Sequence, residues 1–278
     1  MIPIRVLIIT ACLVFIAQPS LAQVEQSYLD VDGIAMPLMN FTDTPGTSAD
    51  GRSIHNLNAT GLMRVAFGVV PLLIEKMSSA SNAKGGSVMT VRIFRDGDPT
   101  EVRQYAGVTI SELRIGELNK QSQEQLLIQI HMVSRTANST PGGSTDLVTS
   151  GFDKDLLSEG FDLRVDNLPD NVIRTKSLSI VPCSGAGCVM MAALEIAVSG
   201  EKRTAWNEWL TTNPTTLRTA QMRLRNVESN VTFGKFLLYD MRPISYAEIE
   251  SVIASEDSED APQPEANVVL SVGKVYLK

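Results

Sequence analysis

One long two-strand pattern occurs twice in this chain, and it constrains the fold more than any other feature. The segment Ala220 to Ile249 is typical of two strands joined by a polar turn at 226–230, and Val88 to Ile115 carries the same arrangement. Six apolar residues of the earlier copy precede their counterparts by a constant 131 positions: Val91, Ile93, Val102, Tyr105, Ile110 and Leu113 match Met222, Leu224, Phe233, Phe236, Met241 and Ile244. A long β-hairpin is therefore predicted in each half.

The segments around the two hairpins also follow a common order. The first half has expected strands at 28–34, 36–41, 61–67 and 125–133, an amphipathic helix at 69–80 and a long polar loop at 42–60. The second half has expected strands at 161–168, 176–181, 190–198 and 267–277, and a helix at 202–210. This shared order favours an internal duplication. Chance similarity between two all-β domains is the alternative.

Length and composition fit two domains. A chain of 278 residues with 44% hydrophobic residues can form two ordinary cores. We predict a mainly β protein with two tandem β-barrels or sandwiches, each carrying one short helix. The expected boundaries are 23–135 for the first domain, 136–160 for a Ser-, Thr- and Gly-rich linker, and 161–278 for the second domain.

The N-terminal 22 residues follow the plan of a bacterial export signal. Arg5 precedes an apolar run at 6–17, and Pro19 precedes a small-x-small cleavage site that ends at Ala22. A mature chain in the periplasm or outside the cell is expected. A retained anchor is an alternative, but the apolar run is shorter than the about 20 residues of a membrane span. A lipoprotein modified at Cys12 is another. No stable membrane span is expected in the mature chain.

The net charge and the cysteines narrow the function further. A net charge of −7 argues against a nucleic-acid partner, because phosphate binding needs basic surface. Outside the export signal the cysteines are Cys183 and Cys188, and in an oxidising compartment they are expected to form a disulfide. A reduced pair is the alternative. A redox-active pair is less favoured, because two residues rather than four usually separate such thiols.

Residues that could carry chemistry are few. The two histidines, His55 and His131, have no serine or cysteine nucleophile placed near them in sequence, and neither has metal-ligand spacing to the cysteines. We expect no enzyme activity, no cofactor and no metal. The acidic insertion at 256–265 is interpreted as a solvated loop, because it lacks the regular spacing and turn glycine of a calcium site, which is the alternative.

The second half resembles a known family. It combines a helix Trp206-Asn207-Glu208-Trp209-Leu210, a strand-turn-strand MRLRN…GKFLLYDMRPIS and a last strand VVLSVGKVYLK. This order of elements is similar to the tube proteins of contractile phage tails and of type VI secretion. The resemblance covers 161–278 best and the first half more weakly. It implies a small β-barrel that packs into a six-domain ring, with rings stacking into a hollow tube. This chain departs from the family in being doubled and in carrying an export signal.

The expected function is therefore an exported structural protein that self-assembles into a ring or tube. If each barrel fills one place of a six-place ring, three chains form a trimer with pseudo-sixfold symmetry. The interface prediction covers four residues: Trp206, Trp209, Leu237 and Leu238. For the two tryptophans, the alternative is that they plug the barrel beneath their own helix. A secreted monomeric binding module of the cell envelope is the alternative function.

Overall fold

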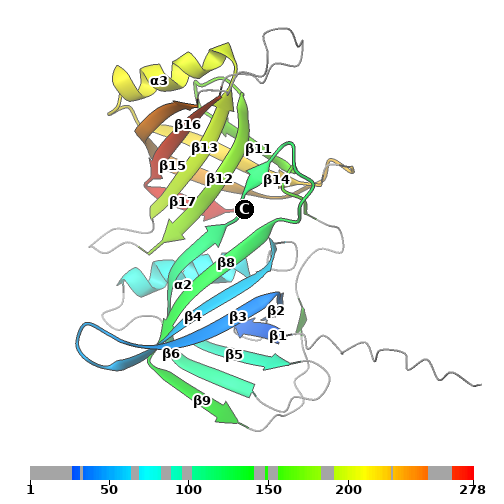
Figure 1. The fold of residues 1–278 in the computed structure, drawn as a ribbon, viewed down its shortest axis with the longest axis vertical. Helices are drawn as coiled ribbons and strands as arrows, with labels where there is room; N and C mark the ends of the chain where they lie inside the picture. Colours follow the sequence, from blue (N-terminus) through cyan, green and yellow to red (C-terminus); the bar gives the residue numbers. More distant parts are fainter. Residues whose placement is uncertain are drawn as a thin grey trace, which may run out of the picture.

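The computed structural model describes residues 27–31, 34–63, 69–82, 89–95, 102–140, 148–149, 156–182, 191–226, 228–249 and 265–278. The molecule is elongated, with the first half of the chain at one end and the second half at the other (Figure 1). Most described residues lie in antiparallel strands, and α2 and α3 are the α-helices among them. The mainly β class predicted from the sequence is confirmed.

The first half contains α2 and ten strands in its described parts. They are β1 (Ser27–Val31), β2 (Ile34–Leu38), β3 (Asn40–Thr47), β4 (Ser53–Leu62), α2 (Val70–Asn82), β5 (Met89–Arg95), β6 (Val102–Ile115), β7 (Leu118–Asn119), β8 (Leu127–Ser134), β9 (Thr136–Thr140) and β10 (Val148–Thr149).

The second half contains α3, a single 3-10 turn and seven strands in its described parts. They are β11 (Phe161–Val165), β12 (Val172–Val181), β13 (Met191–Ser199), η1 (Glu201–Arg203), α3 (Thr204–Thr211), β14 (Arg218–Arg225), β15 (Thr232–Ile249), β16 (Glu265–Val272) and β17 (Lys274–Leu277).

The strands form because their apolar residues alternate with polar ones. In β8, Ile128, Ile130 and Met132 are buried, whereas Gln129 is exposed and His131 is half-buried. The helices follow the other period. The face of α2 predicted from the sequence is buried, with Val70, Leu73, Ile74 and Met77 in the core.

Eight strands form one continuous main sheet. Their order is β3-β4-β8-β6-β12-β13-β16-β15, and every neighbouring pair is antiparallel. The first four strands come from the first half and the last four come from the second half. The main sheet is thus two blocks of four strands, joined where β6 meets β12.

A second layer covers one side of each block. In the first half this layer has the order β2-β1-β5-β6-β9, and in the second half it has the order β11-β14-β15-β17. The long strands β6 and β15 belong to both layers because each bends in its middle. The bends have left-handed residues, Gly107 with φ 64° and Asp240 with φ 55°. The buried side chains between the layers form one core cluster that extends through both halves.

The same strand pairings recur in the two halves. Six antiparallel pairs of the first half, β1–β5, β3–β4, β4–β8, β5–β6, β6–β8 and β6–β9, have counterparts β11–β14, β12–β13, β13–β16, β14–β15, β15–β16 and β15–β17. Even the register agrees, since Tyr105 lies opposite Val91 as Phe236 lies opposite Met222. This recurrence supports an internal duplication.

The constant spacing of 131 residues is wrong beyond the bend. Ile110 pairs with Met132 next to a bulge, and Pro243 pairs with Leu270 next to the equivalent bulge. Ile110 therefore corresponds to Pro243 and not to Met241. Two additional residues in the second copy explain the difference, because they are accommodated at the bend without changing the pairings on either side.

The predicted polar loop at 42–60 is also wrong. This segment is the hairpin of β3 and β4, whose turn contains Gly51 with φ 80°. The threonines provide β-propensity, and burial alternates along β4 with Leu57 and Ala59 in the core, although the overall composition is polar.

The predicted linker at 136–160 is partly built into the first half. Its strand β9 pairs with β6, β10 pairs in parallel with β2, and Leu156 is 1% exposed. The export signal at 1–22, the cysteines Cys183 and Cys188, and the acidic insertion up to 264 lie outside the described residues. The β6–β12 pairing joins the halves into one sheet, so independent folding of two domains stays a prediction.

Candidate assembly interface

The junction between the two blocks is a strand pairing with a sealed apolar side. Three pairs of residues face each other along it: Leu178 and Ile115, Ser179 and Arg114, and Ile180 and Leu113. All four aliphatic side chains in these pairs are at most 1% exposed. The short strand β7 continues the contact, with Leu118 opposite Thr175. The core therefore passes through the junction without interruption.

Polar contacts on the other side of the sheet cross the same junction. The hydroxyl of Ser179 donates to the carboxylate of Glu112. Nε of Arg174 lies 3.7 Å from Oε1 of Glu117. The backbone N–H of Lys120 donates to the carbonyl of Ile173 over 3.1 Å. These contacts fix the register of the junction, and the buried aliphatic pairs supply most of its stability.

The main sheet ends in two edges that have no strand partner within the described chain. At one end β3 pairs only with β4, and at the other end the C-terminal half of β15 pairs only with β16. In the repeat, β3 corresponds to β12 and β15 corresponds to β6. The two outer edges are thus the counterparts of the two edges that meet at the internal junction. Open edges present backbone groups that another strand can pair with.

Three of the four residues predicted for an interface are buried within the chain. Trp206 and Leu238 are 0% exposed and Trp209 is 1% exposed, so another chain cannot reach them without opening the core. The indole N–H groups of both tryptophans donate hydrogen bonds within the chain. Nε1 of Trp206 donates to Asn171 over 3.0 Å, and Nε1 of Trp209 donates to the carbonyl of Thr216 over 2.9 Å. The tryptophans plug their own unit, as the alternative stated.

Leu237 differs from these three because it reaches the surface. It is half-buried and borders an open depression of about 430 Å³ on the outer layer. Tyr239 and Tyr276 line the same depression with their rings 5.7 Å apart, and they are 37% and 45% exposed. An interface role for Leu237 stays a prediction.

A polar cluster that sequence reasoning missed lies behind the β3 edge. Nδ1 of His55 is 3.0 Å from Oδ1 of Asp43, and the hydroxyl of Tyr105 donates to Oδ2 of Asp43 over 2.9 Å. Tyr105 is fully buried. Burial, followed by the hydrogen bond to Asp43, raises the pKa of Tyr105 to about 12. The cluster was missed because its members come from three strands, two of them in the segment predicted as a loop.

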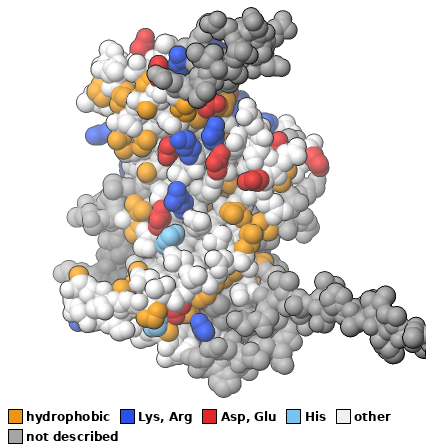
Figure 2. Space-filling model, viewed as in Figure 1, with side chains coloured by type: hydrophobic (Ala, Val, Ile, Leu, Met, Phe, Trp, Pro, Cys, Tyr) orange, Lys and Arg blue, Asp and Glu red, His pale blue; other side chains and the backbone are white. Residues whose placement is uncertain are grey.

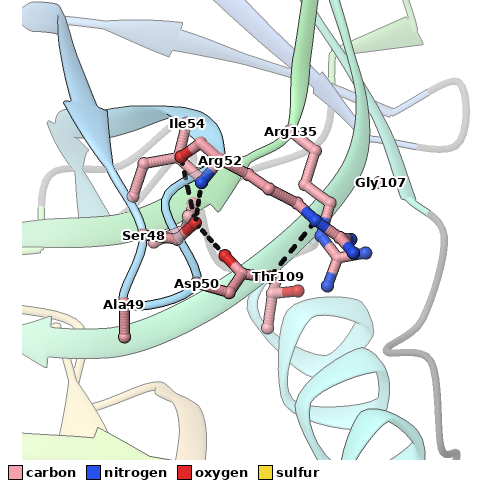
Figure 3. A pocket seen from close by; sticks show the side chains of 9 residues that line it. Ser48, Ala49, Asp50, Arg52, Ile54, Gly107, Thr109 and Arg135 are labelled. Atoms are coloured by element: carbon pink, nitrogen blue, oxygen red, sulfur yellow. Dashed lines mark hydrogen bonds and ion pairs between the residues drawn. The ribbon is translucent and has the colours of Figure 1, made fainter.

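A surface pocket lies at the tip of the β3–β4 hairpin (Figure 3). Its volume is about 400 Å³, and its lining comes from the hairpin, β6 and β8: Ser48, Ala49, Asp50, Arg52, Ile54, Gly107, Thr109, Val133 and Arg135. Asp50 accepts a hydrogen bond from Ser48 and lies 3.3 Å from Nε of Arg52. The hydrogen bond from Ser48 is the main reason that the pKa of Asp50 is lowered. These contacts hold the turn together.

The described part of the chain gives few indications of other chemistry. It contains no group of three or more His, Cys, Asp or Glu side chains arranged to hold a metal ion. Among the described helices, none has the length and apolar character needed to cross a membrane. On the face drawn in Figure 2, acidic and basic side chains lie interspersed and apolar side chains form small separate groups. The absence of enzyme activity stays a prediction.

Comparison with known proteins gives no family for this chain. No protein-family model matches the sequence, and no curated protein matches it. The two open edges of the main sheet therefore remain the candidate functional site on structural grounds alone.

Proposed function

We propose that this chain is an exported structural protein whose copies associate edge to edge into a closed ring, the unit of a tube. The observation that carries the proposal is the organisation of the main sheet. Two equivalent blocks of four strands are joined once, and the counterparts of the joined edges have no strand partner among the described residues. A second copy offers the complementary edge at each end.

The directions of the strands support the proposal. The internal junction is antiparallel. Because β15 and β3 repeat β6 and β12, a contact between β15 of one copy and β3 of the next is antiparallel as well. Such a contact is heterologous, since it joins two different surfaces, and it gives a ring when the rotation between copies closes. Otherwise it gives an open filament.

The number of copies follows from the two blocks per chain. In the tube proteins that the second half resembles, six domains make one ring. Three copies of this chain supply six blocks, giving a trimer with pseudo-sixfold symmetry. The export signal predicted at 1–22 places the assembly in the periplasm or outside the cell, where Cys183 and Cys188 are proposed to be joined.

A specific observation favours the alternative, a monomeric binding module of the cell envelope. The outer edge of β3 carries Pro45, which has no N–H to donate, and the outer edge of β15 carries the charged Glu248. Prolines and charges are common means of protecting edge strands from pairing. In this alternative, the half-buried Leu237 and the exposed Tyr239 and Tyr276 form the surface available for a ligand.

Negative-stain electron microscopy of the exported protein distinguishes the two functions. The proposed ring predicts annular particles with six lobes and a central opening. The binding module predicts particles the size of one elongated chain at every concentration. A uniform field of such small particles contradicts self-assembly.

A further inference from the structure

We propose a specific register for the seam between two copies. Asp43, Thr44 and Pro45 of β3 in one copy lie opposite Glu248, Ala247 and Tyr246 of β15 in the next. The inference rests on the proposed function, because it requires a second copy as the partner. It goes further by stating which residues meet and how stable the seam is relative to the internal junction.

The register follows from the strand pairings of each half. Across the β3–β4 pair Asp43 lies opposite Leu57, and across the β12–β13 pair Leu178 lies opposite Leu194. Leu57 and Leu194 are themselves equivalent, because both face the same position of the next strand, at Met132 and Leu270. Asp43 is therefore the counterpart of Leu178.

The same reasoning places the other edge. Leu113 lies opposite Ile130 in the β6–β8 pair, and Tyr246 lies opposite Val268 in the β15–β16 pair, each just after the equivalent bulge. Two positions further, Ile115 corresponds to Glu248. Because Leu178 faces Ile115 at the internal junction, Asp43 faces Glu248 at the seam between copies.

The inner side of this seam is polar where the internal junction is apolar. The buried pair Leu178 and Ile115 is replaced by two carboxylates, Asp43 and Glu248. Each already has partners in its own chain. Asp43 contacts His55 and Tyr105, whereas Glu248 accepts a hydrogen bond from Tyr246 over 3.2 Å.

Glu248 also lies 3.6 Å from Nε of Arg203. Directly opposite like charges on neighbouring strands are destabilising. Pro45 removes one backbone donor as well. The seam is therefore weaker than the internal junction, and the ring opens while each chain stays folded.

The outer side of the seam favours close approach. Thr44 lies opposite Ala247, so two small side chains face each other, and both are exposed in the single chain. One pair further along, Ile249, which is 38% exposed, lies opposite Thr42 and loses solvent contact in the seam. Association thus buries an aliphatic side chain and brings the two backbones within pairing distance.

Cysteine cross-linking tests the register. In a background with Cys183→Ser and Cys188→Ser, one protein carries Thr44→Cys and a second carries Ala247→Cys. The two proteins are mixed and oxidised with copper phenanthroline, and the predicted register gives a disulfide-linked dimer that contains one copy of each variant. Each of the two thiols loses one proton and one electron to the oxidant. Directly opposite strand positions have the Cβ separation that a disulfide needs.

Two controls fix the interpretation. The internal counterpart, Arg114→Cys with Ser179→Cys in one chain, links within the chain, because these residues face each other at the junction. The off-register pair, Thr44→Cys mixed with Ile249→Cys, is expected to cross-link at least fivefold more slowly. If the mixture sediments as an assembly but the off-register pair links faster, the register is overturned and the proposed function stands. If the mixture is monomeric, the proposed function fails and the seam with it.

Removal of the carboxylate repulsion gives an independent measurement. Glu248→Gln is expected to tighten self-association by about two- to fivefold, the range for one pair of opposed like charges. Glu228→Gln removes the same charge in the exposed turn between β14 and β15, and it is expected to leave association unchanged. Equal effects of the two substitutions, or weaker association with Glu248→Gln, contradict the predicted contact.

Discussion

The two halves of the molecule share their strand pairings but differ in how they use equivalent positions. Asp43, His55 and Tyr105 of the first half form a hydrogen-bonded polar cluster. The same three positions in the second half hold apolar residues: Leu178, Ala192 and Phe236. The shared strand arrangement therefore forms in the second half without such a cluster. What distinguishes the two sets is location, since Leu178 lies on a strand that pairs with β6 of its own chain, whereas Asp43 lies on β3, which pairs only with β4 within the described residues.

The same strand arrangement forms a sealed internal junction at one position and an open sheet edge at another, and the two need different side chains. A junction that never opens is best sealed with aliphatic side chains, which gain stability from burial. At an open edge, charged residues and proline reduce unspecific pairing with other strands. At the equivalent positions 43 and 178, the open edge has a carboxylate and the sealed junction has a leucine.

The largest effect is expected when the residue of the open edge is placed in the sealed junction. Leu178→Asp puts a carboxylate at a site that is 0% exposed and that lacks the histidine and tyrosine partners of Asp43. We expect a loss of about 3–5 kcal/mol in the free energy of unfolding, measured by urea titration. Leu217→Asp is the matched control at a 45% exposed site, with an expected change within about 0.5 kcal/mol. Similar losses for both substitutions contradict a sealed junction.

Exchange of the aromatic residues between the halves is expected to have the next largest effect. Phe236→Tyr adds a buried hydroxyl where Leu178 offers no acceptor, and Tyr105→Phe removes a donor from Asp43. Each substitution is expected to cost about 1–3 kcal/mol by urea unfolding. If Phe236→Tyr leaves the free energy of unfolding unchanged, the second half provides a hydrogen-bond acceptor of its own, and the contrast between the two halves is wrong.

Conversion of the whole cluster is expected to cost less than its parts. The triple variant Asp43→Leu, His55→Ala and Tyr105→Phe gives the first half the apolar set of the second half. Because the three residues are replaced together, none of them leaves another member of the cluster without its partner, and we expect a net change within about 1 kcal/mol, smaller than the summed losses of the three single variants. Additive losses show that the cluster is needed for folding.

The effect that is smallest at neutral pH is a pH dependence at the alkaline end. The pKa of Tyr105 is raised from 10.0 to about 12. A group whose pKa is higher in the folded state contributes stability below its unfolded pKa and loses it as the pH rises. Tyr105 thus stabilises the fold up to about pH 10, and this contribution declines between pH 10 and 12. Tyr105→Phe should remove this component from the pH dependence of urea unfolding, whereas an unchanged dependence assigns it elsewhere.

Much of the fold could be predicted from the sequence because periodicity reports burial. The alternation in β8 and the apolar face of α2 identified a strand and a helix correctly. The hairpin of β3 and β4 could not be predicted in this way. Its outward residues are threonine, asparagine and serine, so composition indicated a loop, whereas pairing with β8 gives it the support that a strand needs.

The candidate site was harder to predict than the fold. Edge strands are defined by which neighbours are absent, and sequence alone does not show the order of strands in a sheet. Trp206 and Trp209 were predicted at an interface because large aromatic residues are common in interfaces. Such residues are equally suited to fill a core, and both are buried in this structure. Asp43, His55 and Tyr105 are 12 and 62 residues apart in their hydrogen-bonded pairs, so no local motif indicates the cluster.

Sedimentation velocity on residues 23–278 tests directly whether the two open edges are complementary surfaces for further copies. At tens of micromolar we expect a species with three times the mass of one chain, which dissociates on dilution and associates more tightly with Glu248→Gln. A single-chain species at every concentration, unchanged by that substitution, would contradict this expectation.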